Sequence, residues 1–342
     1  MTKIQHTPKI VLVTGGAGFI GSNFLHYLLR SDDIVRVINL DVLTYAADVQ
    51  NVSGLAEAYP QRYRWVQGDI SDLVLVEKLF DEEGFDTVIH LAAESHVDRS
   101  IDDPLKFVQT NVMGTATLLH AARKAWKGRE DVRFHHVSTD EVYGSLGDTG
   151  LFTEKTGYDP SSPYSASKAA SDHLVRAWQK TYGLPITISN CSNNYGPHQS
   201  LDKFLPVMIS KALRDQPLPI YGDGQHVRDW LYVEDHCRAI DCIIRRSKTG
   251  QTYNVGGNNA RTNLEVVYLL CDLLMDMKPK SGGHYKDLIS FVADRLGHDR
   301  RYAIDMSKIQ QELGWQPQEK FTTGLRRTIE WYIKNPLPKI FL

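Results

Sequence analysis

Four proton-handling side chains lie in two short segments near the middle of the chain. Asp140 and Glu141 are adjacent acids, and Tyr164 precedes Lys168 by four residues in a helical pattern. Residues four apart share one helical face, so the charge of the lysine favours the phenolate of the tyrosine. A tyrosine with a lowered pKa can take a proton from an alcohol. These residues predict oxidation of an alcohol, and the acid pair predicts a further step.

The N-terminal segment is a candidate site for the cofactor that would accept the hydride. An apolar strand at 9–13 leads into a glycine-rich loop and then a helical pattern. The glycines fit either of two spacings: Gly16, Gly18 and Gly21, or Gly15, Gly18 and Gly21. With either spacing, small residues let the backbone approach a pyrophosphate at a helix N-terminus.

A second strand, at 35–40, ends in an acid that indicates which dinucleotide binds. Asp41 follows Gly21 by twenty positions. A carboxylate there accepts hydrogen bonds from a ribose 2′-hydroxyl and repels a 2′-phosphate, so we predict NAD rather than NADP. The predicted cofactor site consists of Gly15, Gly18, Phe19, Ile20, Gly21, Asp41, Asp69, Ile70, Ala92, Tyr164 and Lys168.

The composition of the 342 residues excludes several other classes of protein. The net charge of -2 argues against a nucleic-acid partner. The sequence contains no run of eighteen apolar residues, so we predict no membrane span. The first eight residues are polar, which argues against a signal peptide. The cysteines lack a CxxC spacing and read as reduced, mostly buried thiols of a cytoplasmic protein. They are Cys191, Cys237, Cys242 and Cys271.

The only adjacent pair of histidines gives no metal site. His135 and His136 fall in a predicted strand, where neighbouring side chains point to opposite faces. We therefore predict no metal.

Strands and helices alternate through the first two-thirds of the chain. The predicted strands are 9–13, 35–40, 63–67, 86–92, 132–138 and 185–190, and the helices between them include 19–30, 72–82, 105–126 and 164–182. This alternation predicts an α/β fold with a Rossmann-type doubly wound parallel sheet. Ligands bind beyond the carboxyl ends of such strands, where the residues named above would converge.

After Gly196 the segments shorten and prolines punctuate them, which predicts a smaller C-terminal α/β lobe that binds the substrate. The predicted elements after Gly196 are strands at 229–233 and 252–255 and helices at 264–277, 306–313 and 322–333. Asp305 and Gly314 are the expected caps of the second helix. We assign 1–196 plus about 225–258 to the NAD-binding domain, and about 197–224 plus 259–342 to the substrate-binding domain.

The acid pair predicts an elimination after the oxidation. A ketone acidifies the hydrogen on the neighbouring carbon, which Glu141 could remove, while a protonated Asp140 donates to the departing hydroxide. Close carboxyl groups push their pKa values apart, giving one acid and one base. Because consecutive strand residues face opposite ways, both acids reach one substrate only where the strand has ended. We therefore predict irregular backbone at 139–141.

Several segments resemble extended short-chain dehydrogenase/reductases acting on nucleotide sugars, and more narrowly the dTDP-glucose 4,6-dehydratases. They are 14–21, 92–100, 138–144, 164–168, 193–197, 221–224 and 227–235, and the triplet at 139–141 is the most specific. The resemblance covers nearly the whole chain. It implies NAD as cofactor, a nucleotide sugar as substrate and a 4,6-dehydratase activity.

The same resemblance implies a role for each matching residue. Tyr164 would be the base at C4, Lys168 would lower its pKa, and Thr139 would hydrogen-bond the C4 oxygen. Glu141 would act at C5 and Asp140 at C6. The residues implied to bind the substrate are Ser95, His96, Asn190, Lys203, Arg228, Asn263 and Arg295. Leu296 stands where the family pattern has proline, which should alter loop stiffness.

The resemblance also implies a homodimer, in which the helices at 105–126 and 164–182 form a four-helix interface. The second helix carries small residues: Ala166, Ala169, Ala170 and Ala177. These alanines suit either a close interface or the chain's own core, and the sequence leaves both readings open.

Two other interpretations of the sequence remain: another enzyme of the same fold, and a protein that binds NAD without catalysis. A 4-epimerase or another nucleotide-sugar 4,6-dehydratase of this fold would use the same tyrosine and lysine, but an epimerase has no need for the acid pair. A non-catalytic NAD-binding scaffold would be expected to lack one of the four proton-handling residues.

Overall fold

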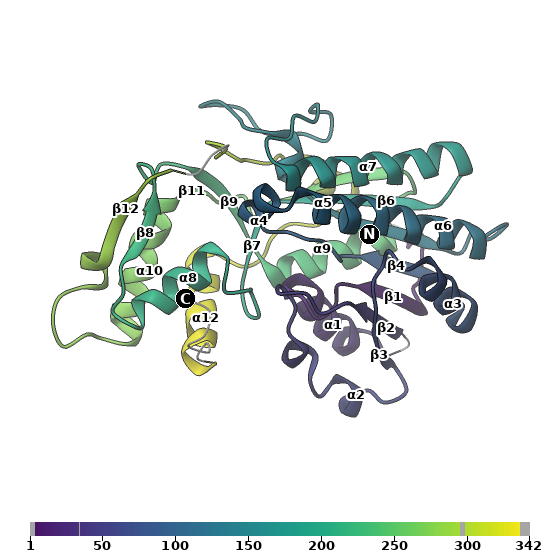
Figure 1. The fold of residues 1–342 in the computed structure, drawn as a ribbon, viewed down its shortest axis with the longest axis horizontal. Coiled ribbons are helices and arrows are strands. Elements are labelled where there is room, and N and C mark those ends of the chain that lie inside the picture. The colour runs from purple at the N-terminus through teal and green to yellow at the C-terminus, as the bar shows by residue number, and fades with distance from the viewer. Residues whose placement is uncertain (1–3, 34, 295–297, 336–342) are drawn as a thin grey trace.

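A seven-stranded parallel sheet forms the centre of the larger part of the molecule (Figure 1). The computed structural model describes residues 4–33, 35–294 and 298–335. The strands of this sheet are β1 (Ile10–Thr14), β2 (Arg36–Asp41), β3 (Tyr63–Gln67), β4 (Thr87–His90), β5 (Arg133–Thr139), β6 (Ile186–Cys191) and β10 (Gln251–Val255). Their order, β10-β6-β5-β4-β1-β2-β3, confirms the predicted doubly wound sheet.

The order reverses on the two sides of β1, which pairs with both β2 and β4. Val11, Leu12 and Val13 of β1 are fully buried, as expected for a strand covered on both faces. The crevice at the carboxyl ends of β1 and β4 is therefore the switch point at which such sheets bind ligands.

Helices cover both faces of the sheet and bury its apolar side chains. The helices packed on one face are α3 (Leu73–Glu83), α6 (Thr115–Ala125) and α7 (Pro163–Tyr182), and those on the other face are α1 (Phe19–Ser31) and α9 (Val233–Arg246). Each set shares a hydrophobic core with the strands, so the sheet is the rigid frame that positions every strand end.

The prediction of one regular helix over 105–126 is wrong. The segment instead contains most of α5 (Pro104–Phe107), a π-helical stretch over Val108–Gly114, and then α6, and the short helix α4 (Val97–Asp102) precedes it. The widened stretch places Asn111 so that its amide donates to the carbonyl oxygen of Glu94 at 3.0 Å. A π-helical segment beside a site is typical of functional positions.

The smaller lobe has two small sheets and its own hydrophobic core, as the sequence predicts. Its strands are β7 (Asn193–Tyr195), β9 (Val227–Tyr232) and β11 (Ala260–Thr262) in one sheet, and β8 (Leu218–Tyr221) and β12 (Ile289–Val292) in the other. Its helices are α8 (Phe204–Ala212), α10 (Asn263–Met277) and α12 (Phe321–Lys334). Figure 1 shows this lobe on the left, beyond the carboxyl ends of the central strands.

The two strands predicted at 229–233 and 252–255 join different sheets. β10 extends the central sheet beside β6, whereas β9 pairs with β7 and β11. The domain limits given above, which place both strands with the NAD-binding domain, stay a prediction.

The short helix α11 (Ser307–Leu313) differs slightly from its prediction. Met306, not Asp305, holds the N-cap position, although the Asp305 carboxylate accepts a hydrogen bond from the Ser307 amide at 2.7 Å. Gly314 ends the helix in a left-handed conformation with φ of 71°, as predicted. The remaining short elements are α2 (Leu55–Ala58) and 3₁₀ turns at Val49–Val52, Asp140–Tyr143 and Tyr285–Leu288.

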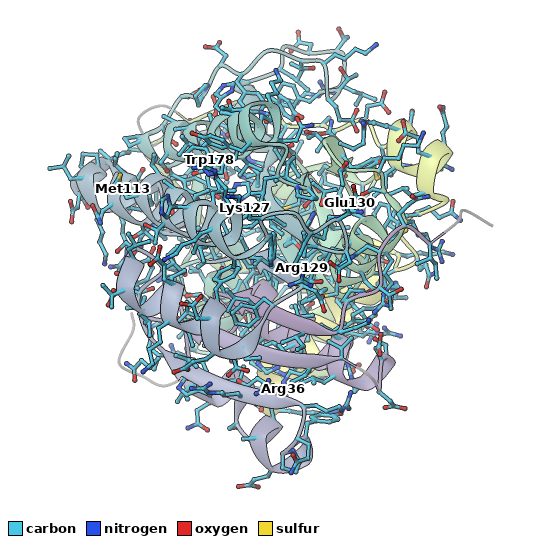
Figure 2. All side chains as sticks on the ribbon, turned by 90° about the vertical axis from the view of Figure 1, so that its right-hand side faces the viewer. Arg36, Met113, Lys127, Arg129, Glu130 and Trp178 are labelled. Atoms are coloured by element: carbon cyan, nitrogen blue, oxygen red, sulfur yellow. The ribbon has the colours of Figure 1, made fainter. Side chains whose placement is uncertain are left out.

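At the opposite end of the sheet the parallel strands begin. Figure 2 views this end, where Arg36 begins β2 and where Lys127, Arg129 and Glu130 lie between α6 and β5. In the part of the chain that the structure describes, no helix combines the length and apolarity that crossing a membrane requires. All four cysteines are free, and three of them are buried.

Candidate active site

The glycine-rich loop after β1 is held by contacts that exclude larger side chains. Gly15 has φ of 73°, and a Cβ there would lie 2.6 Å from the backbone nitrogen of Ala92. A Cβ on Gly21 would lie 2.1 Å from the Gly15 carbonyl oxygen, to which the amide of Gly18 donates at 3.2 Å. The spacing of Gly15, Gly18 and Gly21 therefore forms the turn itself, while Gly16 is restricted separately by a side chain of β2.

Asp41, the last residue of β2, braces this loop. Its carboxylate accepts hydrogen bonds from the amides of Ala17 and Leu43, at 2.9 and 2.8 Å. Burial raises the pKa of Asp41, and the backbone hydrogen bonds oppose that shift. The side chain also faces the cavity beside the glycine loop, where its remaining acceptor positions could meet a ribose.

A cavity of about 480 Å³ lies at the carboxyl ends of the central strands. Its lining includes every residue of the predicted cofactor site and every predicted catalytic residue. The lining therefore brings together Gly15, Gly18, Phe19, Ile20, Gly21, Asp41, Asp69, Ile70, Ala92, Thr139, Asp140, Glu141, Tyr164 and Lys168.

The backbone at the end of β5 confirms the prediction of irregular structure. The strand ends at Thr139, and a 3₁₀ turn over Asp140–Tyr143 follows directly. The Thr139 hydroxyl caps this turn by accepting a hydrogen bond from the Glu141 amide at 3.2 Å. Because the turn replaces strand geometry, Asp140 and Glu141 both line the cavity.

Asp140 is a buried acid whose surroundings favour its protonated form. Only 2% of its surface is exposed. Burial raises its pKa well above the ordinary range, the charges of Glu141 and Asp229 add to the shift, and Arg228 opposes it. The direction agrees with the prediction, but burial rather than a neighbouring charge is the main cause.

Tyr164 and Lys168 lie on the buried face of α7, with 8% and 4% of their surfaces exposed. The lysine ammonium donates to the carbonyl oxygen of Val137 at 2.9 Å. Burial, and after it the charge of Glu141, raises the pKa of Tyr164 well above its ordinary value, while a hydrogen bond with Thr139 lowers it. The expected lowering of this pKa is therefore wrong for the protein's own groups, because desolvation has the largest effect on it.

Two of the predicted substrate-binding residues meet at the wall of the cavity. The Lys203 ammonium donates to the carbonyl oxygen of Ser95 at 2.8 Å, and both residues line the cavity. The neighbouring His96 faces away from it: its Nδ1 caps α4 by accepting from the Arg99 amide, and its Nε2 lies 3.6 Å from Asp202.

Among the described residues, three other predicted substrate-binding residues do not line the cavity. Asn190 is fully buried, and its amide donates to the Thr139 carbonyl oxygen at 3.1 Å. Arg228 donates to the Asp299 carbonyl oxygen at 2.9 Å, and Asn263 begins α10. Arg295 and Leu296 lie outside the described residues.

The sequence reasoning missed an ion pair in the cavity wall. Glu94, 2% exposed, lies 3.1 Å from the ammonium of Lys106, and both line the cavity. Glu94 follows the end of β4 just after Ala92, so the rule that located Ala92 could have identified it. Ser192 and Gln199 also line the cavity without having been predicted.

Among the described residues, one group of three could hold a metal ion, namely His226, Asp294 and His298. The His226 Nε2 and His298 Nδ1 atoms lie 3.2 and 2.6 Å from different oxygens of the Asp294 carboxylate. The two imidazoles stack at 3.7 Å between ring centroids, with an angle of 17° between the ring planes. This arrangement suits two rings that share one carboxylate better than a metal ligand set.

Comparisons with known proteins agree with this site. The sequence model of GDP-mannose 4,6 dehydratase matches residues 12–328. The chain is 51% identical to the dTDP-glucose 4,6-dehydratase of Salmonella typhimurium over 95% of this chain and 93% of that one. It is 53% identical to the dTDP-glucose 4,6-dehydratase of Neisseria gonorrhoeae over 96% of both chains.

A solved structure gives the same result at the level of the fold. The dTDP-glucose 4,6-dehydratase of Bacillus anthracis, in complex with NAD, superposes with a TM-score of 0.86 and 45% identity. The match covers 95% of this chain and 97% of that one. The chain therefore belongs to the nucleotide-sugar 4,6-dehydratase family that these relatives and the matching sequence model represent.

Proposed function

We propose that this protein is an NAD-dependent dTDP-glucose 4,6-dehydratase. It converts dTDP-glucose to dTDP-4-keto-6-deoxyglucose and water by oxidation at C4, elimination across C5 and C6, and reduction at C6. The observation that carries this proposal is the convergence of two acids, a tyrosine and a lysine on one cavity beside the glycine-rich loop. The relatives with this activity match nearly the whole chain.

NAD is the cofactor that the residues around the glycine loop fit best. The turn at Gly15–Gly21 leaves room for a pyrophosphate at the N-terminus of α1, and Asp41 would accept hydrogen bonds from the adenosine ribose. Asp69, Ile70 and Ala92 would line the remainder of its site. When bound, the nicotinamide supplies the acceptor and donor of the hydride.

Oxidation at C4 requires removal of the proton from its hydroxyl group. Tyr164 would take this proton, and Thr139, its hydrogen-bond partner, would also contact the C4 oxygen. Because burial raises the pKa of Tyr164, its phenolate needs nearby positive charge. Lys168 would supply that charge from one helical turn away.

Elimination then uses the two acids after β5. Glu141 would remove the C5 proton, which the C4 ketone has acidified. Asp140, whose pKa burial raises well above its usual range, would give its proton to the hydroxide leaving C6. A 4-epimerase has no step that needs these two groups.

The smaller lobe would hold the nucleotide diphosphate. Arginine and lysine suit phosphate oxygens, arginine through its bidentate fork and lysine as a point charge. Lys203 already lies at the cavity wall, while Arg228 would reach the substrate only after a rearrangement of its present contact with Asp299. The other proposed substrate contacts are Ser95, His96, Asn190, Asn263 and Arg295.

A homodimer through the helices beside the site is part of the proposal. Leu105 and Met113 are apolar yet 76% and 50% exposed. On α7, Ala166 and Ala177 are exposed, whereas Ala169 is buried. The alanines are thus divided between the chain's own core and an outer face that a second copy would cover. Sedimentation of the purified protein tests this arrangement, and a monomer at micromolar concentration contradicts it.

The test of the proposed function is incubation with dTDP-glucose in deuterated water, followed by mass spectrometry and NMR of the sugar. The expected product is a 4-keto-6-deoxy sugar with deuterium at C5, because the C5 proton exchanges with solvent after its removal. Unchanged dTDP-glucose would mean another substrate. Formation of dTDP-galactose would mean epimerisation and would contradict the roles of Asp140 and Glu141.

A further inference from the structure

The helix that carries the catalytic tyrosine and lysine continues with two more charged side chains. Tyr164, Lys168, Asp172 and Arg176 follow one another at intervals of four residues along α7. They form a stripe that turns slowly around the helix. Asp172 is completely buried, yet the mechanism above gives it no role.

Three side chains from other segments contact the Asp172 carboxylate. The Tyr158 hydroxyl donates to Oδ2 at 2.6 Å, and the Asn190 amide nitrogen lies 3.3 Å from the same oxygen. The Nε2 atom of His136 lies 3.2 Å from Oδ1. These contacts fix the position of a carboxylate that burial would otherwise make costly.

Asp172 is an anion in this setting. Burial raises its pKa, but His136, Lys168 and Arg176 together bring the pKa below its ordinary value. The compensating positive charges lie one helical turn away on either side, at Lys168 and Arg176.

Lys168 and Asp172 are buried side chains one helical turn apart on α7, so the Asp172 anion favours the charged form of the lysine. Burial lowers the pKa of Lys168, and Asp172 is the strongest influence that opposes the shift. The hydrogen bond from the ammonium to the Val137 carbonyl oxygen, at 2.9 Å, ends on a neutral acceptor. Without a buried anion nearby, the ammonium would have no charged partner in the helix–sheet interface.

The other ionisable groups that face this part of the stripe carry no charge at neutral pH. Burial lowers the pKa of His136, on β5, to about 4, and lowers that of His90, on β4, well below 6.5. Burial raises the pKa of Cys191, on β6, to about 12, and also raises that of Tyr158, in the loop before α7. None of them can replace Asp172 as the anion.

From this geometry, and resting on the proposed function, we infer that Asp172 is a positioning residue that keeps Lys168 charged beneath Tyr164. Asn190 extends the arrangement, because its amide also donates to the carbonyl oxygen of Thr139 at 3.1 Å. The buried carboxylate is thereby linked both to the lysine and to the strand end that carries the acid pair.

A double-mutant cycle on thermal stability tests the interaction between Asp172 and Lys168 in the absence of substrate. The proteins compared are the wild type, Asp172→Asn, Lys168→Met and the variant with both changes. Asp172→Asn should lower Tm, because it leaves a buried ammonium unpaired, and adding Lys168→Met should recover at least half of that loss. If only the double variant folds, the pairing is also supported. A double variant whose Tm falls by the sum of the single shifts, or that fails to fold along with Asp172→Asn, overturns it.

The pH profile of kcat/KM tests the consequence for catalysis. In Asp172→Asn the pKa of Lys168 should fall, so the alkaline limb should move to lower pH by about one unit or more. Tyr158→Phe removes a hydrogen bond to Asp172 but no charge, and should leave this limb in place. A uniform loss of activity at all pH values in Asp172→Asn would indicate a structural role only and overturn the inference. Should the wild type not form the 4-keto product, the proposed function fails, while the stability cycle still decides the role of Asp172.

Discussion

The sheet side of the cavity and the smaller lobe differ in how their predicted residues are placed. Along the strand ends, each predicted cofactor or catalytic residue lines one cavity. In the lobe, Arg228 and Asn263 lie outside that lining and contact their own lobe instead. In the proposed mechanism the reacting side chains are thus assembled in advance on the sheet, whereas Arg228 and Asn263 would have to rearrange to reach the nucleotide.

On the sheet side of the cavity, removal of the Tyr164 hydroxyl should cause the largest loss of activity. Tyr164→Phe should lower kcat by about 10³-fold or more, because it removes the group proposed to take the C4 proton. Product formation from dTDP-glucose measures the loss, and an unchanged Tm serves as the control for folding. Activity within tenfold of the wild type would remove Tyr164 from its proposed role.

Separating the two chemical steps should have the next largest effect. Glu141→Gln should reduce product formation by about 10²- to 10³-fold while leaving oxidation at C4 intact. The absorbance of reduced nicotinamide should therefore rise after dTDP-glucose is added and persist. No rise in absorbance would show that Glu141 is also needed for oxidation.

Gly15 in the glycine-rich loop and Gly84 at the end of α3 form a matched pair of glycines in the left-handed conformation. Gly15→Ala places a Cβ 2.6 Å from the Ala92 nitrogen, whereas a Cβ at Gly84, with φ of 65°, meets nothing within 4 Å. Gly15→Ala should weaken NAD binding on the order of tenfold, about 1.4 kcal/mol, and Gly84→Ala should not change it. Calorimetric titration with NAD measures both, and equal affinities would show that the loop tolerates a side chain.

The lobe should respond differently, through affinity rather than rate. Arg228→Met should raise KM for dTDP-glucose about tenfold with less than a threefold change in kcat, as expected for loss of a charge-assisted contact. Arg300→Met, on an exposed arginine paired with Asp223, is the control and should leave KM unchanged. A fall in kcat alone in Arg228→Met would place this arginine with the chemistry and erase the contrast between the two regions.

The smallest expected effect is on stability and tests the protonation of Asp140. Its pKa is higher in the folded than in the unfolded chain, so the unfolded chain loses its proton first as pH rises, and stability falls between the two pKa values. Asp140→Asn has no such titration and should gain Tm relative to wild type, by on the order of 2–4 °C at pH 8 but little at pH 3. Scanning calorimetry at both pH values measures this, and equal differences at both would show that Asp140 is not buried as an acid.

Most of the central sheet follows from local pattern. Strands such as β3 and helices such as α1 and α7 begin and end within two residues of their predicted limits, because apolar runs and caps mark them. The interrupted helix before α6 was missed, because its π-helical stretch depends on Asn111 reaching the carbonyl of Glu94. Pairing of β9 with β7 and β11 was also invisible, since short strands carry little periodicity.

The sequence by itself determined the cofactor loop, the tyrosine–lysine helix and the acid pair, because each depends on residue types at short spacing. Only the tertiary structure decided the charge states. Burial raises the pKa values of Asp140 and Tyr164 and lowers that of Lys168, which the charge of Asp172 raises. Desolvation depends on which segments, distant in sequence, cover a side chain, and no local pattern encodes that.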